Sequence, residues 1–351
     1  MYRSMATSRE LTDRKADILR ALVRQYIRTG EPVGSEILAS AAGLKVSSAT
    51  IRNELAALEE LGFLKQPHTS AGRVPTELAY RYYVDLLPAR SKLRETERRA
   101  IIHFFDEALA DVDAILRGTT QLLSRLTRYA SLALAPSQRE TAIIRAELIL
   151  LGTTTLLLVV FDTGHVEKRV IDVDPHVSER NLDRVSRTMT ETFRGNTLDQ
   201  AQTLAEERER SAESESERNV FGRVAESLRS MGETSEAEHI FLGGVANIAS
   251  EAGFDRRETM SQIFEALERE SAVLGLLREA AASPLVSVTI GRENPVPEMW
   301  ETSLVAAPFA AGAAVGTIGV VGPMRMDYAS AIAAVRAVAE RLTAAVEALS
   351  R

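Results

Sequence analysis

A short stretch near the start of the chain combines side chains that can read the edges of DNA bases. It runs Ser47-Ser48-Ala49-Thr50-Ile51-Arg52-Asn53-Glu54, and either of its first two residues can cap a helix. Arginine can bind guanine through two hydrogen bonds, asparagine can bind adenine in the same way, and alanine can touch the methyl group of thymine. The small residues beside Arg52 and Asn53 would let such a helix approach the bases closely.

The spacing of apolar residues predicts that this stretch opens a helix over residues 47–61, which ends at Gly62. Ile51, Leu55 and Leu58 fall on one face of that helix and should face the core. The candidates for contact with DNA lie on the opposite face or at the start of the helix: Ser47, Ser48, Ala49, Thr50, Arg52 and Asn53. The alternative is an ordinary helix face in contact with water.

A second group of candidate residues follows in a predicted hairpin over residues 63–75. A turn that contains Gly72 would join its two short strands. Hydroxyl groups and cations at such a turn suit contact with phosphates or with the minor groove. The candidates are Lys65, His68, Thr69, Ser70 and Arg73. The alternative is a polar hairpin tip that binds nothing.

Helices must hold these two segments in place. Residues 12–29 carry apolar side chains at helical spacing, and Gly30 and Pro32 end that helix. Further short helices are expected over residues 35–41 and 76–87. Three helices followed by a hairpin form a winged helix-turn-helix, whose third helix enters the major groove. We therefore assign residues 9–88 to a winged-helix DNA-binding domain.

The rest of the chain predicts a mixture of helices and strands, so the fold class is α+β. A nearly continuous helix is expected over residues 93–129, a β-hairpin within residues 143–173, and a last helix over residues 328–349. Helices are also expected over residues 178–193, 220–231 and 257–282, and strands over residues 240–242, 285–290, 302–308 and 315–321.

The final strands need partners, and the hairpin within residues 143–173 offers them. This pairing predicts one sheet domain made of residues 91–175 and 284–351. The mostly helical residues 176–283 would then be inserted into that domain.

The composition bounds the class of protein. The chain has 351 residues, of which 45% are hydrophobic, which suffices for two or three folded domains. No apolar run reaches the ~20 residues of a membrane span, and the N-terminus has no apolar signal-peptide core. The chain has no cysteine. We therefore expect a cytoplasmic protein without disulfides, thiolate metal sites or a membrane partner.

Charge is spread unevenly along the chain. The first 90 residues have 13 Lys and Arg and 10 Asp and Glu, a balance of +3, although the whole chain carries −7. The remainder therefore carries −10. A basic head on an acidic body suits a head that touches phosphate and a body that does not.

Longer motifs in the head resemble one known family. They include residues 26–35 (Tyr-Ile-Arg-Thr-Gly-Glu-Pro-Val-Gly-Ser), residues 47–55, residues 66–76 (Gln-Pro-His-Thr-Ser-Ala-Gly-Arg-Val-Pro-Thr) and residues 80–85 (Tyr-Arg-Tyr-Tyr-Val-Asp). Three later motifs agree: residues 241–248, residues 290–294 (Ile-Gly-Arg-Glu-Asn) and residues 319–328. The chain resembles the bacterial heat-inducible transcription repressor family HrcA over nearly its whole length. Residues 1–8 and 201–218 carry no matching motif.

The resemblance implies a dimeric repressor with three parts. These are the winged helix, a domain similar to the GAF fold, and a dimerisation domain inserted into it. It also implies double-stranded DNA as a partner, in the form of an inverted-repeat operator called CIRCE upstream of chaperone operons. A GroEL-type chaperonin keeps such repressors active, and heat stress lowers their activity.

Two other functions remain open from the sequence. A winged-helix regulator could sense a small ligand, with a pocket between residues 143–173 and 285–321, although the aliphatic side chains there fit a core equally well. An enzyme with a DNA-binding appendage is a further alternative. No catalytic triad or phosphate loop supports an enzyme, and the five histidines lack the spacing of metal ligands. We therefore expect neither enzymatic activity nor a cofactor.

Residues near the final strands are predicted to serve the structure. Trp300 follows a proline-rich loop and is interpreted as a packing anchor. Arg325, Asp327 and Tyr328 lie where a strand passes into the last helix. We expect them to form a local network of ion pairs and helix caps. The alternative for these three residues is contact with a partner.

Overall fold

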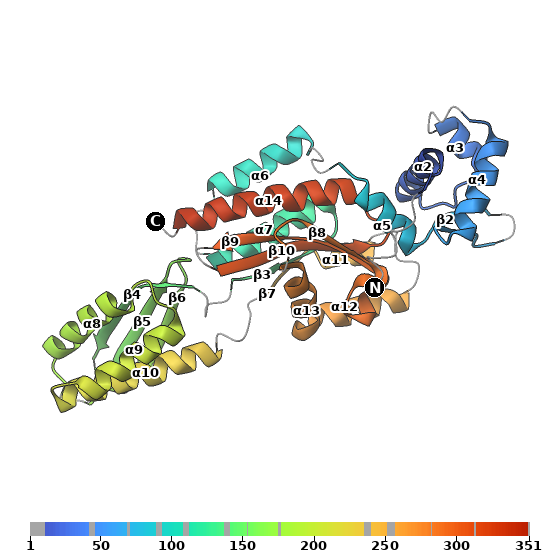
Figure 1. Cartoon of the computed structure of the whole chain (residues 1–351). Coiled ribbons are helices and arrows are strands. Elements are labelled where there is room, and N and C mark those ends of the chain that lie inside the picture. The colour runs from blue at the N-terminus through green and yellow to red at the C-terminus, as the bar shows by residue number, and fades with distance from the viewer. Residues whose placement is uncertain are drawn as a thin grey trace.

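The computed structural model describes residues 11–41, 46–68, 71–88, 93–107, 112–136, 141–152, 154–174, 177–234, 240–250, 257–281, 283–311 and 314–349. They form three units that follow one another across the molecule (Figure 1). The winged-helix unit comprises residues 11–88, the central unit residues 93–136 and 240–349, and the inserted unit residues 141–234. Within the described residues, no helix is long and apolar enough to cross a membrane.

The winged-helix unit has the predicted order of elements. These are α2 (Asp13–Thr29), α3 (Ser35–Ala41), α4 (Ser48–Glu60), β1 (Leu64–Lys65), β2 (Val74–Pro75) and α5 (Glu77–Asp85). Helix α2 ends at Gly30, which adopts a left-handed conformation with φ of 75°. Ile18, Leu22 and Leu58 are fully buried, so the apolar faces of α2 and α4 meet as their spacing predicts. The winged-helix prediction is confirmed.

The central unit is built on a five-stranded sheet with the order β7-β3-β10-β9-β8. Its strands are β3 (Ala130–Leu134), β7 (Ile240–Gly243), β8 (Ser287–Ile290), β9 (Thr302–Ala311) and β10 (Ala314–Pro323). Its helices are α6 (Glu95–Glu107), α7 (Val112–Thr127), α11 (Ala246–Ser250), α12 (Arg257–Glu268), α13 (Glu270–Ala281) and α14 (Tyr328–Leu349), with short 3₁₀ helices η2 (Gly291–Glu293) and η3 (Pro297–Met299). The α+β class is therefore confirmed.

Helices cover both faces of this sheet. Helices α7 and α14 pack on one face, and α13 packs on the other (Figure 1). Neighbouring residues of one strand consequently enter different cores: Ala133 joins the core with Val335 and Val338, whereas Leu132 joins the core with Leu277. A sheet buried on both faces needs continuous apolar strands rather than alternating ones.

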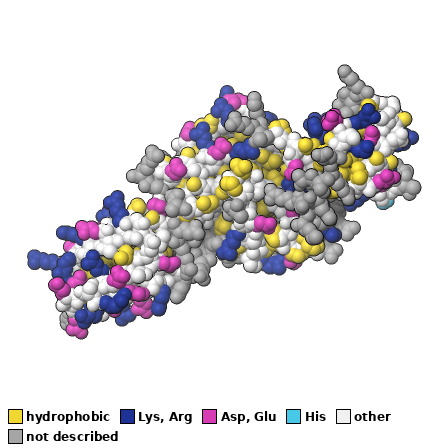
Figure 2. Space-filling model, in the orientation of Figure 1, with side chains coloured by type: hydrophobic (Ala, Val, Ile, Leu, Met, Phe, Trp, Pro, Cys, Tyr) yellow, Lys and Arg dark blue, Asp and Glu magenta, His cyan; other side chains and the backbone are white. Residues whose placement is uncertain are grey.

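The inserted unit has its own sheet and its own core. Its elements are β4 (Ile143–Leu151), β5 (Thr154–Phe161), β6 (Val166–Ile171), α8 (Glu179–Phe193), α9 (Leu198–Ser211) and α10 (Glu215–Thr234). The strands form an antiparallel meander in the order β4-β5-β6. Phe161, Met189 and Phe221 are fully or almost fully buried between the sheet and the helices. Figure 2 shows positive and negative side chains mixed over this unit.

The predicted pairing between residues 143–173 and the final strands is wrong. Strand β10 pairs instead with β3 and β9, and β3 pairs with β7. The error came from β3, because Ala130-Ser131-Leu132-Ala133-Leu134 has no alternation of polar and apolar residues to mark it as a strand. The unit between β3 and β7 therefore spans residues 141–234, whereas the sequence grouped residues 176–283.

The predicted long helix over residues 93–129 also differs from the structure. It consists of two helices, α6 and α7, and residues 108–111 between them lie outside the described residues. Helix α6 packs beside α14, and α7 packs against both α14 and the sheet (Figure 1). The apolar spacing predicted the helical state correctly, but not the break.

Candidate nucleic-acid interface

Helix α4 begins with the serine cap that the sequence predicts. The Ser47 hydroxyl accepts a hydrogen bond from the backbone N–H of Thr50 at 3.2 Å and lies 2.9 Å from the Thr50 hydroxyl. This cap satisfies one of the free N–H groups of the first turn. The remaining free N–H groups and the helix dipole make this end of α4 attractive to a phosphate.

The outer face of α4 presents the predicted residues to solvent. Ala49, Arg52, Asn53 and Ala56 are exposed, at the spacing of one helix face, and Ile51 is fully buried on the other side. Ser48 and Thr50 are half-buried beside them, and Ser47 is exposed. Among the described residues, no side chain pairs with Arg52 or Asn53. Both therefore remain available for the bidentate contacts that their types allow.

A carboxylate on this helix is neutralised by α2. Glu54 lies 3.0 Å from Lys15 Nζ and 3.8 Å from Arg14 Nη1. The Glu54 side chain is only 16% exposed, whereas that of Arg14 is 60% exposed. An unpaired carboxylate near the outer face of α4, which we call the recognition face, would repel phosphates. Lys15 and Arg14 remove that repulsion, and Arg14 adds an exposed cation that the sequence argument missed.

The wing is held together by backbone contacts. Val33 and Arg73 exchange two backbone hydrogen bonds of 2.9 Å, so Val33 adds a third short segment to β1 and β2. A side chain at Gly72 would lie 2.5 Å from the Val33 carbonyl carbon. Only glycine permits this close approach. Gln66 Nε2 also donates to the Ala71 carbonyl at 3.0 Å across the wing.

The structure separates the predicted wing residues into three groups. Lys65 and His68 are exposed. Arg73 is half-buried, and its Nε lies 2.8 Å from Glu59 Oε2 of α4, in an ionic contact without good hydrogen-bond alignment. Thr69 and Ser70 lie outside the described residues. The exposed side chains of Lys65 and His68 thus lie in the same unit as the exposed face of α4, and Arg73 joins the wing to that helix.

Residues singled out in the central unit mainly hold its loops. Asn294 is buried and donates from Nδ2 to the carbonyls of Gly291 and Met299 at 2.8 and 3.1 Å. Trp300 donates from Nε1 to the Asn294 carbonyl at 3.2 Å, although the residue is 40% exposed. Asp327 caps α14 by accepting the Ser330 N–H at 3.1 Å. The Asp327 cap is as predicted, whereas Trp300 is too exposed to serve as a buried packing anchor.

Arg325 departs from the predicted local network. It forms no ion pair with Asp327 within the described chain. Its Nη1 instead donates to the Ile27 carbonyl at 3.4 Å, at the end of α2. The described residues also contain no group of three or more His, Asp or Glu side chains that could hold a metal ion.

Comparisons with known proteins agree with this geometry. A family model described as "Winged helix-turn-helix transcription repressor, HrcA DNA-binding" matches residues 10–85, and one described as "HrcA protein C terminal domain" matches residues 113–332. A solved structure titled as that of a hypothetical protein has a TM-score of 0.66 and 25% identity. The match covers 97% of this chain and 100% of that chain.

Curated relatives are similar over nearly their whole length. The heat-inducible transcription repressor HrcA of Parafrankia sp. (strain EAN1pec) is 38% identical over 332 residues, which is 94% of this chain and 97% of the relative. That of Desulforamulus reducens is 34% identical over 336 residues, covering 95% of this chain and 96% of the relative. With both family models matched in order along its length, the chain belongs to the heat-inducible transcription repressor family HrcA.

Proposed function

We propose that this chain represses chaperone operons in the cytoplasm by binding an inverted-repeat operator of the CIRCE type as a homodimer. A transcription repressor acts by occupying DNA, so the function needs no catalytic group. The observation that carries the proposal is the exposed face of α4, where Ala49, Arg52 and Asn53 lie side by side. Their types match those that read base edges in the major groove.

A two-fold operator requires a two-fold protein. We propose that the second copy docks on the outer face of the β4-β5-β6 sheet. On that face Ile149, Leu156 and Val170 stand in one row across the strands. Val170 is 70% exposed and Leu151, at the end of β4, is 55% exposed. An exposed apolar face of this kind marks a protein contact.

The charges of the same face favour a second copy as its occupant. Glu147 and Lys168 flank Leu158 in the neighbouring row. A two-fold axis that runs parallel to β5 and crosses that row at Leu158 would place Glu147 of one copy against Lys168 of the other. An isologous interface must be self-complementary in this way.

The same surface supports a role for a GroEL-type chaperonin. A monomer exposes the aliphatic side chains that a dimer would cover, and heat shifts the balance toward such species because stability margins are small. We propose that the chaperonin returns the monomer to the active dimer. When heat diverts the chaperonin to unfolded proteins, the active fraction falls and the chaperone genes are expressed.

The ligand-sensing alternative gains no support from the central unit. Residues expected to line its pocket, such as Val305, Phe309 and Ile318, are packed as core against α14 and α7. Residues 143–171 lie in a different sheet from residues 287–323. The two halves of the expected pocket therefore do not face each other across one sheet.

A binding titration at fixed salt tests the proposal. The probes are a duplex that carries the CIRCE inverted repeat and a scrambled duplex of the same composition. We expect a preference of roughly a thousandfold or more, with two protomers on each duplex. Equal affinity for both duplexes, in the presence and the absence of chaperonin, would show that CIRCE is not the operator of this protein.

A further inference from the structure

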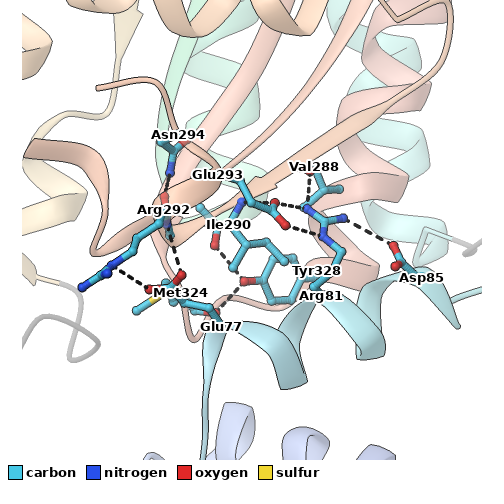
Figure 3. Close-up of polar contacts among 12 residues, drawn as sticks. Glu77, Arg81, Asp85, Val288, Ile290, Arg292, Glu293, Asn294, Met324 and Tyr328 are labelled. Atoms are coloured by element: carbon cyan, nitrogen blue, oxygen red, sulfur yellow. Dashed lines mark hydrogen bonds and ion pairs between the residues drawn. The ribbon is translucent and has the colours of Figure 1, made fainter. Parts of the chain in front are cut away.

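Two distant sequence motifs meet where the winged-helix unit joins the central unit (Figure 3). Arg81 of α5 donates from Nε to Glu293 Oε1 at 2.8 Å, and its Nη2 contacts Glu293 Oε2 and donates to the Val288 carbonyl at 2.6 Å. Glu293 also accepts the Ile290 N–H at 2.8 Å. The two charged residues are 212 positions apart in the chain.

This ion pair is largely buried, and both carboxylate oxygens of Glu293 contact the guanidinium of Arg81. The Arg81 side chain is 6% exposed and that of Glu293 is 13% exposed. Burial alone would lower the pKa of Arg81, but the hydrogen bonds and the charge of Glu293 raise it above its usual value. A buried pair adds little to stability compared with apolar packing, and removal of Glu293 would leave Arg81, among the described residues, only one carboxylate, that of the half-exposed Asp85, whose Oδ1 lies 3.4 Å from Arg81 Nη1. Such a pair therefore favours one arrangement of the two units over others.

A second contact fixes the winged-helix unit at a different point. Arg325 of the central unit donates to the Ile27 carbonyl at the C-terminal end of α2, where the helix dipole favours a cation. A side chain at Gly30 would lie 2.8 Å from Arg325 Nη1. The glycine that ends α2 therefore also makes room for the arginine.

Aromatic packing lies between these two contacts. The rings of Tyr80 in α5 and Tyr328 in α14 have centroids 6.0 Å apart, and both side chains are almost fully buried. The buried residues of the winged-helix unit and of α14 form one continuous core. The contacts at α2, at α5 and between the tyrosines involve more than one helix of the winged-helix unit. Together they therefore fix the orientation of that unit relative to the central unit.

Orientation matters for a dimeric repressor because DNA has a fixed geometry. One added base pair moves a half-site by about 3.4 Å and rotates it by about 35° around the duplex axis. A rigidly mounted pair of recognition helices cannot follow that change, whereas loosely tethered ones can. The joint between the units thus bears directly on which operator spacing is accepted.

We propose that Arg81, Glu293 and Arg325 are positioning residues that hold each recognition helix at a fixed orientation and thereby set the half-site spacing that the repressor accepts. This inference rests on the proposed binding of an inverted repeat by a dimer. None of the three residues needs to touch DNA. They act through the placement of α4, which lies at the far side of the winged-helix unit.

The test measures the affinity of the full-length protein for three kinds of duplex. These carry the inverted repeat at its natural spacing, the repeat with one base pair inserted or removed, and a single half-site. Glu293→Gln removes the charge with little change in shape. Glu298→Gln is the matched control, because Glu298 pairs with Arg269, which also belongs to the central unit.

We expect the wild-type protein and Glu298→Gln to lose about tenfold or more in affinity when the spacing changes by one base pair. Glu293→Gln should lose less than about threefold and keep its affinity for the single half-site. The same spacing dependence in Glu293→Gln and wild type would overturn the inference alone. A wild-type protein that binds the repeat no better than one half-site would overturn the proposed dimeric operator binding, and this inference with it.

A distance measurement between the two units needs no binding to DNA. It therefore also tests variants that are less conservative for folding, such as Arg81→Gln and Arg325→Ala. The chain has no cysteine, so spin labels at Arg24→Cys and Glu340→Cys report only the distance between the winged-helix and central units. Both positions are exposed. Labelled protein exchanged into excess unlabelled protein should give a narrow distance distribution, and this distribution should broaden in Arg81→Gln, Arg325→Ala and Glu293→Gln. Equal widths would contradict a positioning role.

Discussion

The guanidinium of Arg73 in the wing lies 2.8 Å from the carboxylate of Glu59 at the end of the recognition helix. The pair is partly exposed, with side-chain exposures of 21% and 33%, so its contribution to stability is small. Its geometry nevertheless places a cation between the wing and α4, the two elements that we propose contact DNA. We propose that a phosphate of bound DNA and Glu59 compete for this arginine.

This competition predicts how two substitutions differ. Arg73→Ala should weaken binding to all duplexes alike and reduce the salt dependence by about one unit, because one phosphate contact is lost. Glu59→Gln should leave the salt dependence unchanged, because Arg73 is still present. Its affinity for DNA should stay the same or rise, because the competing carboxylate is gone. Titrations at several salt concentrations measure both. If the dependence of affinity on salt concentration is unchanged in Arg73→Ala, Arg73 does not contact a phosphate.

Arg52 should act on specificity rather than on general affinity. We expect Arg52→Ala to weaken operator binding by roughly 1–3 kcal/mol, with a smaller loss on random DNA, because a bidentate contact to a base edge is lost. Competition between the operator and a scrambled duplex measures the difference. Arg24→Ala is a suitable control, since Arg24 is exposed on α2. Equal losses on both duplexes would make Arg52 a phosphate contact.

The cap of the recognition helix predicts an effect on stability. Ser47→Ala removes the hydroxyl that accepts the Thr50 N–H, which should lower the free energy of unfolding by about 0.5–2 kcal/mol. Ser48→Ala is the matched control, because Ser48 is the first residue within α4. Thermal or denaturant unfolding followed by circular dichroism compares the two. If both variants unfold alike, residue 47 is not the cap in solution.

The winged helix could be predicted from the sequence because its signals are local. Gly30 and Pro32 end one helix, Ser47 begins another, and Gly62 follows it. Apolar residues at helical spacing then define which face is buried, so the exposure of Arg52 followed directly. The same short-range pattern placed Lys65, His68 and Arg73 in or beside the wing strands, where the structure has them.

The joint between the units could not be predicted in this way. Arg81 and Glu293 stand in separate motifs, and no local pattern says that they meet. Arg325 was expected to pair with its neighbour Asp327, yet it reaches the end of α2 instead. Strand β3 gave no signal either, because both of its faces are buried. Contacts between distant segments depend on the packing of whole elements, which spacing along the chain does not encode.

The apolar face of the inserted unit supplies the last prediction. Val170→Asp should disrupt the proposed homodimer, because that dimer would bury two copies of a largely exposed valine, and each burial stabilises it by about 1.5–3 kcal/mol. We expect the dimer dissociation constant to rise by about a hundredfold or more, measured by sedimentation velocity. Leu285→Asp is the control, since Leu285 is 74% exposed outside this sheet.

The same variant separates dimerisation from DNA recognition. Val170→Asp should lose the preference for the inverted repeat over one half-site, while its affinity for the single half-site is kept, because the winged helix is untouched. A Val170→Asp protein that remains dimeric would show that the two-fold contact lies elsewhere in the molecule. The proposal that the outer face of α4 reads DNA would not be affected in that case, since it depends only on residues within the winged-helix unit.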